Sequence, residues 1–310
     1  MTDIEHFNIA IIGAGPAGMT AAIYAARSGM KTVILEAGSA GGQVAESPDI
    51  ENYPGFEKIN GMDLAGTFRK HAENYVEIRE GEEIEQIIPE GEIIRLKTGW
   101  SEYTADGVII ATGAHHRKLG CKGEEEFSGR GISYCATCDG FFFKGKRAVM
   151  VGGGNTAVSD TLYLKNAGVD VSIIHRRDTF RAEATLVKRL EESGIPKIMN
   201  SEVQEIYGEN VVKGVKVRNK LTGEITDIPV EGVFIAVGVV PNTEFLKGSG
   251  IKLDDGGYII TDRKQRTNIP RIYAAGDVTG GLQQIVVGCG EGAVAATTAY
   301  EEITNPYWKK

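Results

Sequence analysis

The chain has 310 residues, a formal net charge of −8, and 42% hydrophobic and 25% charged residues. This length allows about two domains, each able to bury a core of its own. The negative charge gives no electrostatic support for a nucleic-acid or anionic-membrane partner, and no apolar run reaches transmembrane length. The N-terminus lacks the basic start and apolar core of a signal peptide, and the four cysteines are too few for a disulfide scaffold. We therefore expect a cytoplasmic protein that binds neither nucleic acid nor membrane.

The first 36 residues have the pattern of a dinucleotide-binding unit. Phe7–Ile12 predicts a buried strand, a helix follows up to Ser28, and Lys31–Leu35 predicts a second strand. The turn Gly13-Ala14-Gly15-Pro16-Ala17-Gly18 lies between the first strand and the helix. Its glycines permit a tight turn and the close approach of a pyrophosphate to the helix N-terminus. Glu36, which ends the second strand, can accept hydrogen bonds from a ribose, so a free 2′-hydroxyl and hence FAD or NAD is predicted.

A second unit of the same kind begins near residue 148. Ala148–Val151 predicts a strand, Gly152-Gly153-Gly154-Asn155-Thr156-Ala157 a phosphate-binding turn, and a helix follows to about Asn166. Val169–Ile174 predicts the next strand. Glu36 lies 23 residues after Gly13 (36 − 13), and the residue 23 after Gly152 (175 − 152) is His175.

The acid of the first unit is therefore replaced by His175-Arg176-Arg177, with Arg181 one helical turn further. A carboxylate there would repel a 2′-phosphate, whereas arginines offer it bidentate, charge-assisted hydrogen bonds. The second unit is accordingly predicted to bind NADPH.

The C-terminal third returns to the first unit. Val233–Gly238 resembles Val108–Gly113, since each is an apolar strand that ends in a small residue and glycine. Ile272–Asp277 predicts one more strand, and Gly288–Tyr300 a helix on the sheet, whose N-terminus near Gln284 would place partial positive charge beside a cofactor. The predicted fold class is α/β, with two Rossmann-like domains, the second inserted in the first. Residues 1–114 and 241–310 form the FAD-binding domain, and residues 115–240 the NADPH-binding domain.

The inserted domain also carries Cys135-Ala136-Thr137-Cys138-Asp139. A zinc site would need four ligands; Cys121 and Cys289 are single and far apart, although His115 and His116 could join Cys121, so zinc stays an alternative here. A redox disulfide needs a thiolate nucleophile, a resolving thiol and a proton source. Cys135, Cys138 and Asp139 supply these three groups, so we favour the redox interpretation and expect no metal.

Over essentially its whole length the chain resembles the low-molecular-weight, NADPH-dependent thioredoxin reductases. Besides the motifs above, the resemblance rests on Gly41-Gly42-Gln43, on Glu51-Asn52-Tyr53-Pro54-Gly55, on Ala111-Thr112-Gly113 and on Gly276-Asp277. It implies electron transfer from NADPH through FAD and a Cys135–Cys138 disulfide to thioredoxin or a thioredoxin-like protein, in a homodimer. It further implies that Cys138 faces the flavin, that Cys135 attacks the partner disulfide and that Asp139 is the acid/base.

The resemblance also assigns the cofactor residues. FAD is expected to contact Gly13, Gly15, Pro16, Ala17, Gly18, Glu36, Ala37, Gly41, Gly42, Gln43, Asn52, Thr112, Gly113, Asp277, Gln284 and Ile285. NADPH is expected to contact Gly152, Gly154, Asn155, Thr156, Ala157, His175, Arg176, Arg177, Arg181 and Gly238. One position departs from the bacterial pattern, because Gln283 stands where an arginine is usual.

Both the dithiol and the NADPH unit must reach one flavin, so we expect a hinged rotation about Ala114–Arg117 and Val239–Asn242. Alternatives remain open. A related flavoprotein could take electrons from ferredoxin or a deazaflavin, or pass them to another disulfide. A ferredoxin–NADP reductase of similar fold would not need Cys135 and Cys138, and a nucleotide-sensing module without catalysis would bind no flavin.

Overall fold

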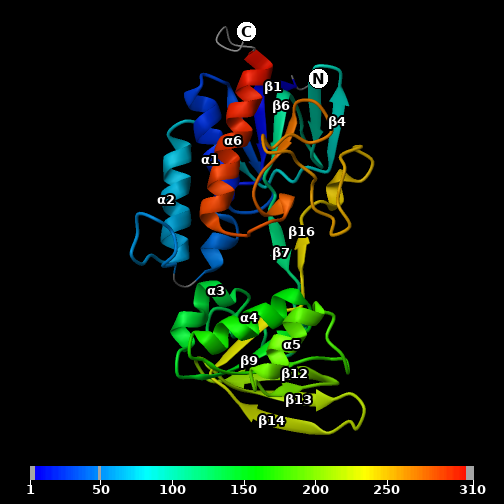
Figure 1. Cartoon of the computed structure of the whole chain (residues 1–310). Coiled ribbons are helices and arrows are strands. Elements are labelled where there is room, and N and C mark those ends of the chain that lie inside the picture. Colours follow the sequence, from blue (N-terminus) through cyan, green and yellow to red (C-terminus); the bar gives the residue numbers. More distant parts are fainter. Residues whose placement is uncertain (1–3, 48–49, 305–310) are drawn as a thin grey trace. The chain divides into compact units, whose positions relative to one another are not determined.

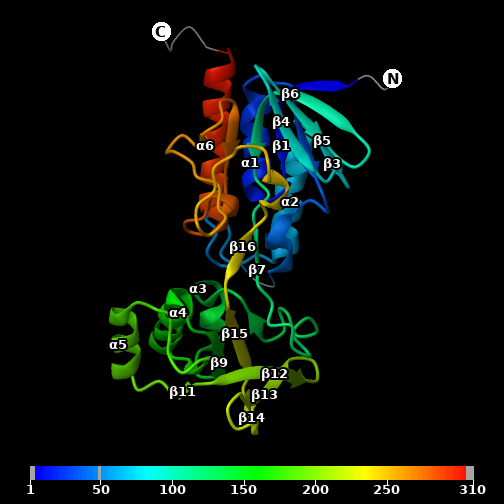
Figure 2. The same cartoon turned by 90° about the vertical axis from the view of Figure 1, so that its right-hand side faces the viewer.

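The computed structural model describes residues 4–47 and 50–304. The chain divides into two compact units (Figures 1 and 2). The first is built from both ends of the chain, up to His115 and from Val240 onward, and the second is His116–Val239. The chain leaves the first unit through β7 (Ala114–His116) and returns through β16 (Val239–Pro241), and these two strands pair with each other.

The sheet of the first unit has the strand order β3-β2-β1-β6-β5-β4, with β17 paired to β6. Parallel pairing joins β1, β2, β3, β6 and β17, whereas β4 and β5 pair antiparallel. The strands are β1 (Glu5–Ile12), β2 (Thr32–Glu36), β3 (Glu77–Glu80), β4 (Gln86–Glu90), β5 (Ile93–Lys97), β6 (Glu102–Ile110) and β17 (Ile272–Ala274). The carboxyl ends of β1, β2, β6 and β17 thus lie at one edge, where such folds bind their ligands.

Side-chain alternation along β1 explains the two cores of this unit. Ile9 and Ile11 lie in the cluster formed with the helices, whereas Ala10 and Ile12 lie in the cluster on the other face of the sheet. A central strand buried on both faces needs a continuous apolar run, and FNIAII supplies one. The helices are α1 (Pro16–Arg27), α2 (Gly61–Glu73) and α6 (Ile285–Thr304), and 3₁₀ turns lie at Gly42–Glu46, Glu244–Leu246 and Asp277–Thr279.

Helix α6 crosses α1 closely because Gly292 has no side chain. A Cβ at Gly292 would lie 2.2 Å from the carbonyl oxygen of Ala17. The helix begins at Ile285 and ends at Thr304, so it extends beyond the predicted Gly288–Tyr300 at both ends. The start near Gln284 was predicted correctly, whereas the predicted range was too short because it followed only the small residues.

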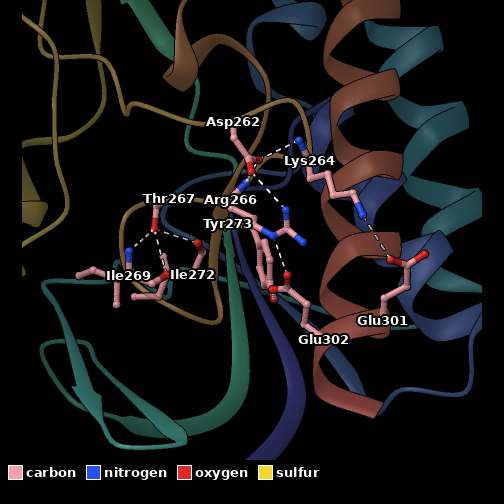
Figure 3. Close-up of polar contacts among 9 residues, drawn as sticks. All are labelled: Asp262, Lys264, Arg266, Thr267, Ile269, Ile272, Tyr273, Glu301 and Glu302. Carbon is pink, nitrogen blue, oxygen red and sulfur yellow. Dashed lines mark hydrogen bonds and ion pairs between the residues drawn. The ribbon is translucent and has the colours of Figure 1, made fainter. Parts of the chain in front are cut away.

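Polar contacts hold the C-terminal end of α6 to the loop that leads into β17 (Figure 3). Glu302 accepts hydrogen bonds from Arg266 Nε at 2.5 Å and from the Tyr273 hydroxyl at 2.7 Å. Tyr273 is 1% exposed, and burial raises the pKa of its hydroxyl. Arg266 also pairs with Asp262 at 3.2 Å. These contacts fix the direction of β17, which carries Gly276 and Asp277 to the edge of the sheet.

The second unit repeats the parallel sheet and adds an antiparallel one. Its parallel order is β11-β10-β9-β15-β8, and its antiparallel order is β12-β13-β14. The strands are β8 (Ile132–Ser133), β9 (Arg147–Gly152), β10 (Asp170–Ile174), β11 (Lys197–Ile198), β12 (Ser201–Gly208), β13 (Val212–Asn219), β14 (Ile225–Pro229) and β15 (Gly232–Ala236). The helices are α3 (Ala136–Asp139), α4 (Asn155–Asn166) and α5 (Ala184–Glu192), with a 3₁₀ turn at Gly140–Phe143.

The same alternation builds the core of the second unit. Val149 and Val151 of β9 pack with the antiparallel sheet, whereas Ala148 and Met150 pack with α4 and α5.

The predicted α/β class is confirmed. The predicted helix after the second turn ends at Asn166 as observed, and the helix after the first turn ends at Arg27, one residue before the predicted end.

Candidate active site

The three glycines of the first turn have different tasks. Gly13 has φ +105°, and a Cβ there would lie 2.4 Å from the Ala111 carbonyl oxygen. A Cβ at Gly18 would lie 1.9 Å from the carbonyl oxygen of Gly13. Gly15, by contrast, has no protein atom within 4 Å of the position of a Cβ. The outer glycines are required by the packing of the chain itself, and Gly15 leaves open space at the start of α1.

That space has the chemistry of an anion site. Gly15 is the N-cap residue of α1, and no side chain caps the first N–H groups of the helix. Such groups carry partial positive charge and bind phosphate. Pro16 and Ala17 are the first residues of α1, and Gly42 lies against Gly15, with a Cβ position 3.2 Å from the Gly15 Cα.

Glu36 holds the backbone of the first turn. Its Oε2 accepts a hydrogen bond from Ala14 N at 2.6 Å, and its Oε1 accepts one from Gly38 N at 2.8 Å. Carboxylate oxygens have about four acceptor sites in total, so capacity for a ribose hydroxyl remains. Ala37 follows in an exposed loop. The backbone contacts of Glu36 were not predicted from the sequence.

Predicted flavin-side residues from distant parts of the chain meet in the first unit. Asn52 donates a hydrogen bond to Gln284 Oε1 at 2.9 Å, directly before the first residue of α6, Ile285. The Gln43 amide donates to the carbonyl oxygen of Ala114, and Gly41 N donates to Ala14 O at 2.9 Å. These contacts bring the loop after β2 and the start of α6 to the edge of the sheet.

Asn242 was predicted only as the end of a hinge segment, and its contacts were not predicted from the sequence. Its Nδ2 donates to Thr112 O at 2.7 Å, and its backbone N donates to Gly113 O at 3.0 Å. Thr112 Oγ1 donates in turn to the Asn242 carbonyl oxygen at 2.8 Å. Asn242 therefore fixes the end of β6, where the chain enters and leaves the first unit. A Pro-Asn dipeptide after an apolar strand was the available signal.

Glu291 is a residue that sequence reasoning missed. Its Oε2 accepts hydrogen bonds from Gly276 N at 2.7 Å and from Thr279 Oγ1 at 3.4 Å. Burial raises the pKa of Asp277, and the nearby charge of Glu291 raises it further. Burial also raises the pKa of Glu291 itself. The signal was an acid inside the small-residue stretch GCGEGAVAA.

The second glycine turn follows the same plan with different neighbours. A Cβ at Gly152 would lie 2.4 Å from Ala236 O, and one at Gly153 would lie 2.1 Å from the His175 ring. Gly154 has no atom within 4 Å and is the N-cap of α4, again without a side-chain cap. Asn155 is tied to Glu183 through hydrogen bonds of 2.8 and 3.1 Å. The position of open space and uncapped N–H groups is the same as in the first turn.

The basic residues after β10 divide into a buried and an exposed part. His175 is only 6% exposed, and burial followed by the charges of Arg177 and Arg181 lowers its pKa. It packs beneath the turn and stacks on Phe180. Arg176, Arg177 and Arg181 are exposed, and among the described residues none of the three forms an ion pair. The exposed guanidinium groups are therefore available to an anion.

The other predicted nucleotide residues lie around this turn. Thr156 is exposed on the first turn of α4, and Ala157 is buried behind it. Gly238, at φ +122°, accepts a hydrogen bond at its carbonyl oxygen from Arg117 N at 2.9 Å.

Cys135 and Cys138 form a disulfide with a Cα–Cα distance of 5.3 Å at the start of α3. Two donors surround the sulfur of Cys135: Cys138 N at 3.2 Å and Thr137 Oγ1 at 3.4 Å. Hydrogen bonds to sulfur favour the thiolate that forms when the disulfide is reduced. Burial raises the pKa of Cys121 to about 11, which keeps that thiol protonated.

Ser133 joins Asp139 to the disulfide segment. Its hydroxyl donates to Asp139 Oδ2 at 2.6 Å and accepts from Cys135 N at 3.1 Å. Asp139 was predicted from the sequence, whereas Ser133 was not, because a serine before a Cys-x-x-Cys motif has no signature of its own. Within residues 4–47 and 50–304, no group of three or more His, Cys, Asp or Glu side chains is arranged to hold a metal ion.

Comparison with known proteins gives the family. A model described as pyridine nucleotide-disulphide oxidoreductase matches residues 7–292. The thioredoxin reductases of Listeria monocytogenes and Bacillus subtilis are 44% and 42% identical to the chain, covering 96% of it and 94% of each relative. The chain belongs to the pyridine nucleotide-disulphide oxidoreductases, in the group of the thioredoxin reductases. Members of this family use a flavin and a pyridine nucleotide.

Solved structures agree with this assignment. Thioredoxin reductase of Streptococcus pyogenes matches with a TM-score of 0.93 at 42% identity, over 97% of this chain and 99% of that one. The enzyme of Lactococcus lactis in its FR conformation matches with a TM-score of 0.66 at 43% identity, over 97% and 100%. The predicted family and its flavoprotein disulfide oxidoreductase activity are confirmed. In the described part of the chain, no helix has the length and apolar character needed to span a membrane.

Proposed function

We propose that this oxidoreductase transfers electrons from NADPH, through FAD and the Cys135–Cys138 disulfide, to the disulfide of thioredoxin or a thioredoxin-like protein. The observation that carries the proposal is the disulfide itself, which lies at the start of α3 in the unit that also holds the second glycine turn. A dithiol–disulfide pair beside a nucleotide site fits a reductase better than an enzyme that passes electrons to an iron–sulfur protein.

The first unit is proposed as the FAD domain. The open space at Gly15 and the uncapped start of α1 fit a pyrophosphate, and Glu36 fits a ribose with free hydroxyls. Asn52, Asp277 and Gln284 would contact the flavin-bearing half. When bound, FAD would supply the two-electron relay between nicotinamide and disulfide. We propose residues 1–114 and 241–310 as this domain and residues 115–240 as the NADPH domain, in support of which the compact units change at residues 115/116 and 239/240.

The second unit is proposed to bind NADPH in preference to NADH. Gly154 supplies open space at the start of α4, and Arg176, Arg177 and Arg181 are exposed. Three guanidinium groups suit the dianionic 2′-phosphate that distinguishes NADPH. Buried His175 would support the turn from below rather than contact the nucleotide as one of an exposed basic cluster.

The reduced dithiol is proposed to act in two exchange steps. The Cys135 thiolate, stabilised by Cys138 N and Thr137 Oγ1, attacks one sulfur of the partner disulfide. A mixed disulfide forms, and the other partner sulfur leaves as a thiolate that takes a proton from Asp139. Cys138 then gives its thiol proton to the Asp139 carboxylate and attacks Cys135 Sγ. The bond between Cys135 and the partner breaks, the partner sulfur leaves with the electron pair, and the enzyme disulfide is restored. Phe141, which is 68% exposed, offers the partner an apolar contact nearby.

We further propose that the two units rotate relative to each other during turnover. The nicotinamide and the dithiol both belong to the second unit, and both must reach a flavin held by the first. Solved relatives of nearly equal identity match with TM-scores of 0.93 and 0.66, a difference expected when rigid units are arranged differently in two proteins. An engineered crosslink between the units should stop turnover and leave one half-reaction fast. Normal turnover of the crosslinked protein would contradict the rotation.

A homodimer in the cytoplasm is the proposed form. Large apolar side chains on α1, α2 and α6 are exposed: Tyr24 at 50%, Met62 at 64%, Val286 at 48% and Val294 at 39%. A second copy of the chain would cover such a surface. Light scattering after gel filtration tests this, and a monomer at micromolar concentration would contradict it.

An electron count tests the proposed redox centres. Flavin and disulfide each accept two electrons, so anaerobic titration with dithionite should consume about four electrons per wild-type chain. The Cys135→Ser/Cys138→Ser variant should consume about two and keep its flavin spectrum. A colourless protein, or equal consumption by the two proteins, would overturn the assignment.

A further inference from the structure

Ser133 is held in one position by the sheet. It is the last residue of β8, where it pairs with Phe234 of β15, and it is only 3% exposed. The next residue, Tyr134, donates a hydrogen bond from its hydroxyl to Glu124 at 3.0 Å. Glu124, which is 2% exposed, also accepts from the backbone of Leu119 and Gly120. The hydroxyl of Ser133 therefore extends from a rigid segment, not from a loose loop.

The single proton of this hydroxyl has two acceptors within reach. Asp139 Oδ2 lies at 2.6 Å and the carbonyl oxygen of Cys135 at 3.2 Å. Distances of about 2.5–2.7 Å are typical of an O–H donor to a carboxylate, so the proton is directed at Asp139. The lone pairs of Ser133 Oγ accept from Cys135 N at 3.1 Å. One buried oxygen thus connects the backbone of the attacking cysteine with the carboxylate of the acid/base.

We propose that Ser133 is a positioning residue, which holds the Asp139 carboxyl group toward the dithiol and stabilises its ionised form after it has given up its proton. The inference rests on the proposed function, in which Asp139 protonates the leaving sulfur. In that step a bond forms between Cys135 Sγ and the partner sulfur, and the partner S–S bond breaks. The leaving sulfur takes the electron pair and the Asp139 proton. The resulting carboxylate keeps the hydrogen bond from Ser133, which is strongest for the charged form.

A double-mutant cycle tests this proposal. Asp139→Asn is expected to lower thioredoxin-dependent turnover about 100-fold or more, as for loss of a general acid. Ser133→Ala is expected to lower it about 10-fold, the effect of one hydrogen bond to a charged group. If Ser133 acts through Asp139, Ser133→Ala should change turnover less than about 2-fold when it is added to Asp139→Asn. Ser133→Gly removes the same hydroxyl and must give the same non-additive result.

Two control variants distinguish this role from general support of the fold. Ser201 is equally buried, at 3%, and its hydroxyl donates to Met199 O, away from the disulfide, so Ser201→Ala should leave turnover unchanged. Tyr134→Phe removes the hydrogen bond to Glu124 in the same segment and leaves Ser133 and Asp139 unchanged in sequence, so its effect should multiply with that of Asp139→Asn.

The outcomes separate the inference from the proposed function. Full turnover by Ser133→Ala, or an equal loss with and without Asp139→Asn, overturns the role of Ser133 while the reductase function stands. If the wild-type protein does not reduce thioredoxin with NADPH, the proposed function fails, and the inference fails with it.

Discussion

The two glycine turns share an open glycine at the start of a helix and differ in the charged groups around it. In both, the glycine at the third position of the turn (Gly15 or Gly154) faces open space at an uncapped helix start. After the first turn, the second strand ends in Glu36, which binds the turn backbone through Ala14 N. After the second turn, the equivalent position is buried His175, and it is followed by the exposed arginines Arg176, Arg177 and Arg181. We propose that the glycines define a phosphate site in each unit. The nucleotide would then be selected by Glu36 in the first unit and by the exposed arginines after His175 in the second.

The same substitution in the two turns should have two different consequences. Gly15→Val would fill the first space, and the purified protein should lose its flavin almost completely. Gly154→Val would fill the second, so the protein should stay yellow but lose about 100-fold or more in kcat/KM for NADPH. The flavin absorbance per protein and the NADPH oxidation rate measure the two effects. Retention of flavin by Gly15→Val would disprove the assignment of the first turn.

Removal of the arginines should weaken the preference for NADPH. Each guanidinium bound to a phosphate is worth on the order of a factor of 10, so alanine at Arg176, Arg177 and Arg181 together should reduce the NADPH/NADH ratio of kcat/KM about 100- to 1,000-fold. Arg189 on α5 is also exposed, and Arg189→Ala provides the control. An unchanged NADPH/NADH ratio in the triple variant would show that these arginines do not bind the 2′-phosphate.

The helices that follow the two turns differ in one half-buried acid. Helix α1 contains no acid, whereas α4 contains half-buried Asp160, whose pKa burial raises to about 6. A carboxyl with a raised pKa in the folded state destabilises the fold once it is ionised. The free energy of unfolding therefore falls as the pH rises from about 4 to 6, and it does not fall further from this cause above that range.

Asp160→Asn should therefore stabilise the protein above pH 6 and have little effect below pH 4. The raised pKa of Asp160 corresponds to about 3 kcal/mol of lost stability. Because the side chain is partly exposed, we expect Asp160→Asn to raise the free energy of unfolding by about 1–2 kcal/mol. Thermal unfolding at pH 8 and pH 4 measures it, with the exposed Asp170→Asn as a control. Equal stabilisation at both pH values would show that the gain does not come from the buried charge.

Local sequence patterns predicted those parts of the site that lie on single turns. The strand–glycine–helix–strand pattern and the Cys-x-x-Cys motif were sufficient to find both turns and the disulfide. The contacts of Ser133, Asn242 and Glu291 were missed because the fold creates them. Asn242 binds Thr112, which lies 130 residues away, and Glu291 binds Gly276 across the start of α6.

The burial of individual side chains also could not be predicted from the sequence. His175 stands in a basic run, yet it packs beneath Gly153, and only the three-dimensional arrangement separates it from the neighbouring arginines. The antiparallel strands β12–β14 also escaped prediction, because they belong to neither nucleotide pattern.

In the proposed route, electrons pass from NADPH at the second turn to FAD at the first turn and then to the Cys135–Cys138 disulfide. The most direct measurement is NADPH oxidation that depends on added thioredoxin, with wild type and Cys135→Ser compared at equal flavin content. We predict steady oxidation by the wild type and none by Cys135→Ser, while NADPH still bleaches the flavin of both proteins. Thioredoxin-dependent oxidation at the wild-type rate in Cys135→Ser would contradict this account.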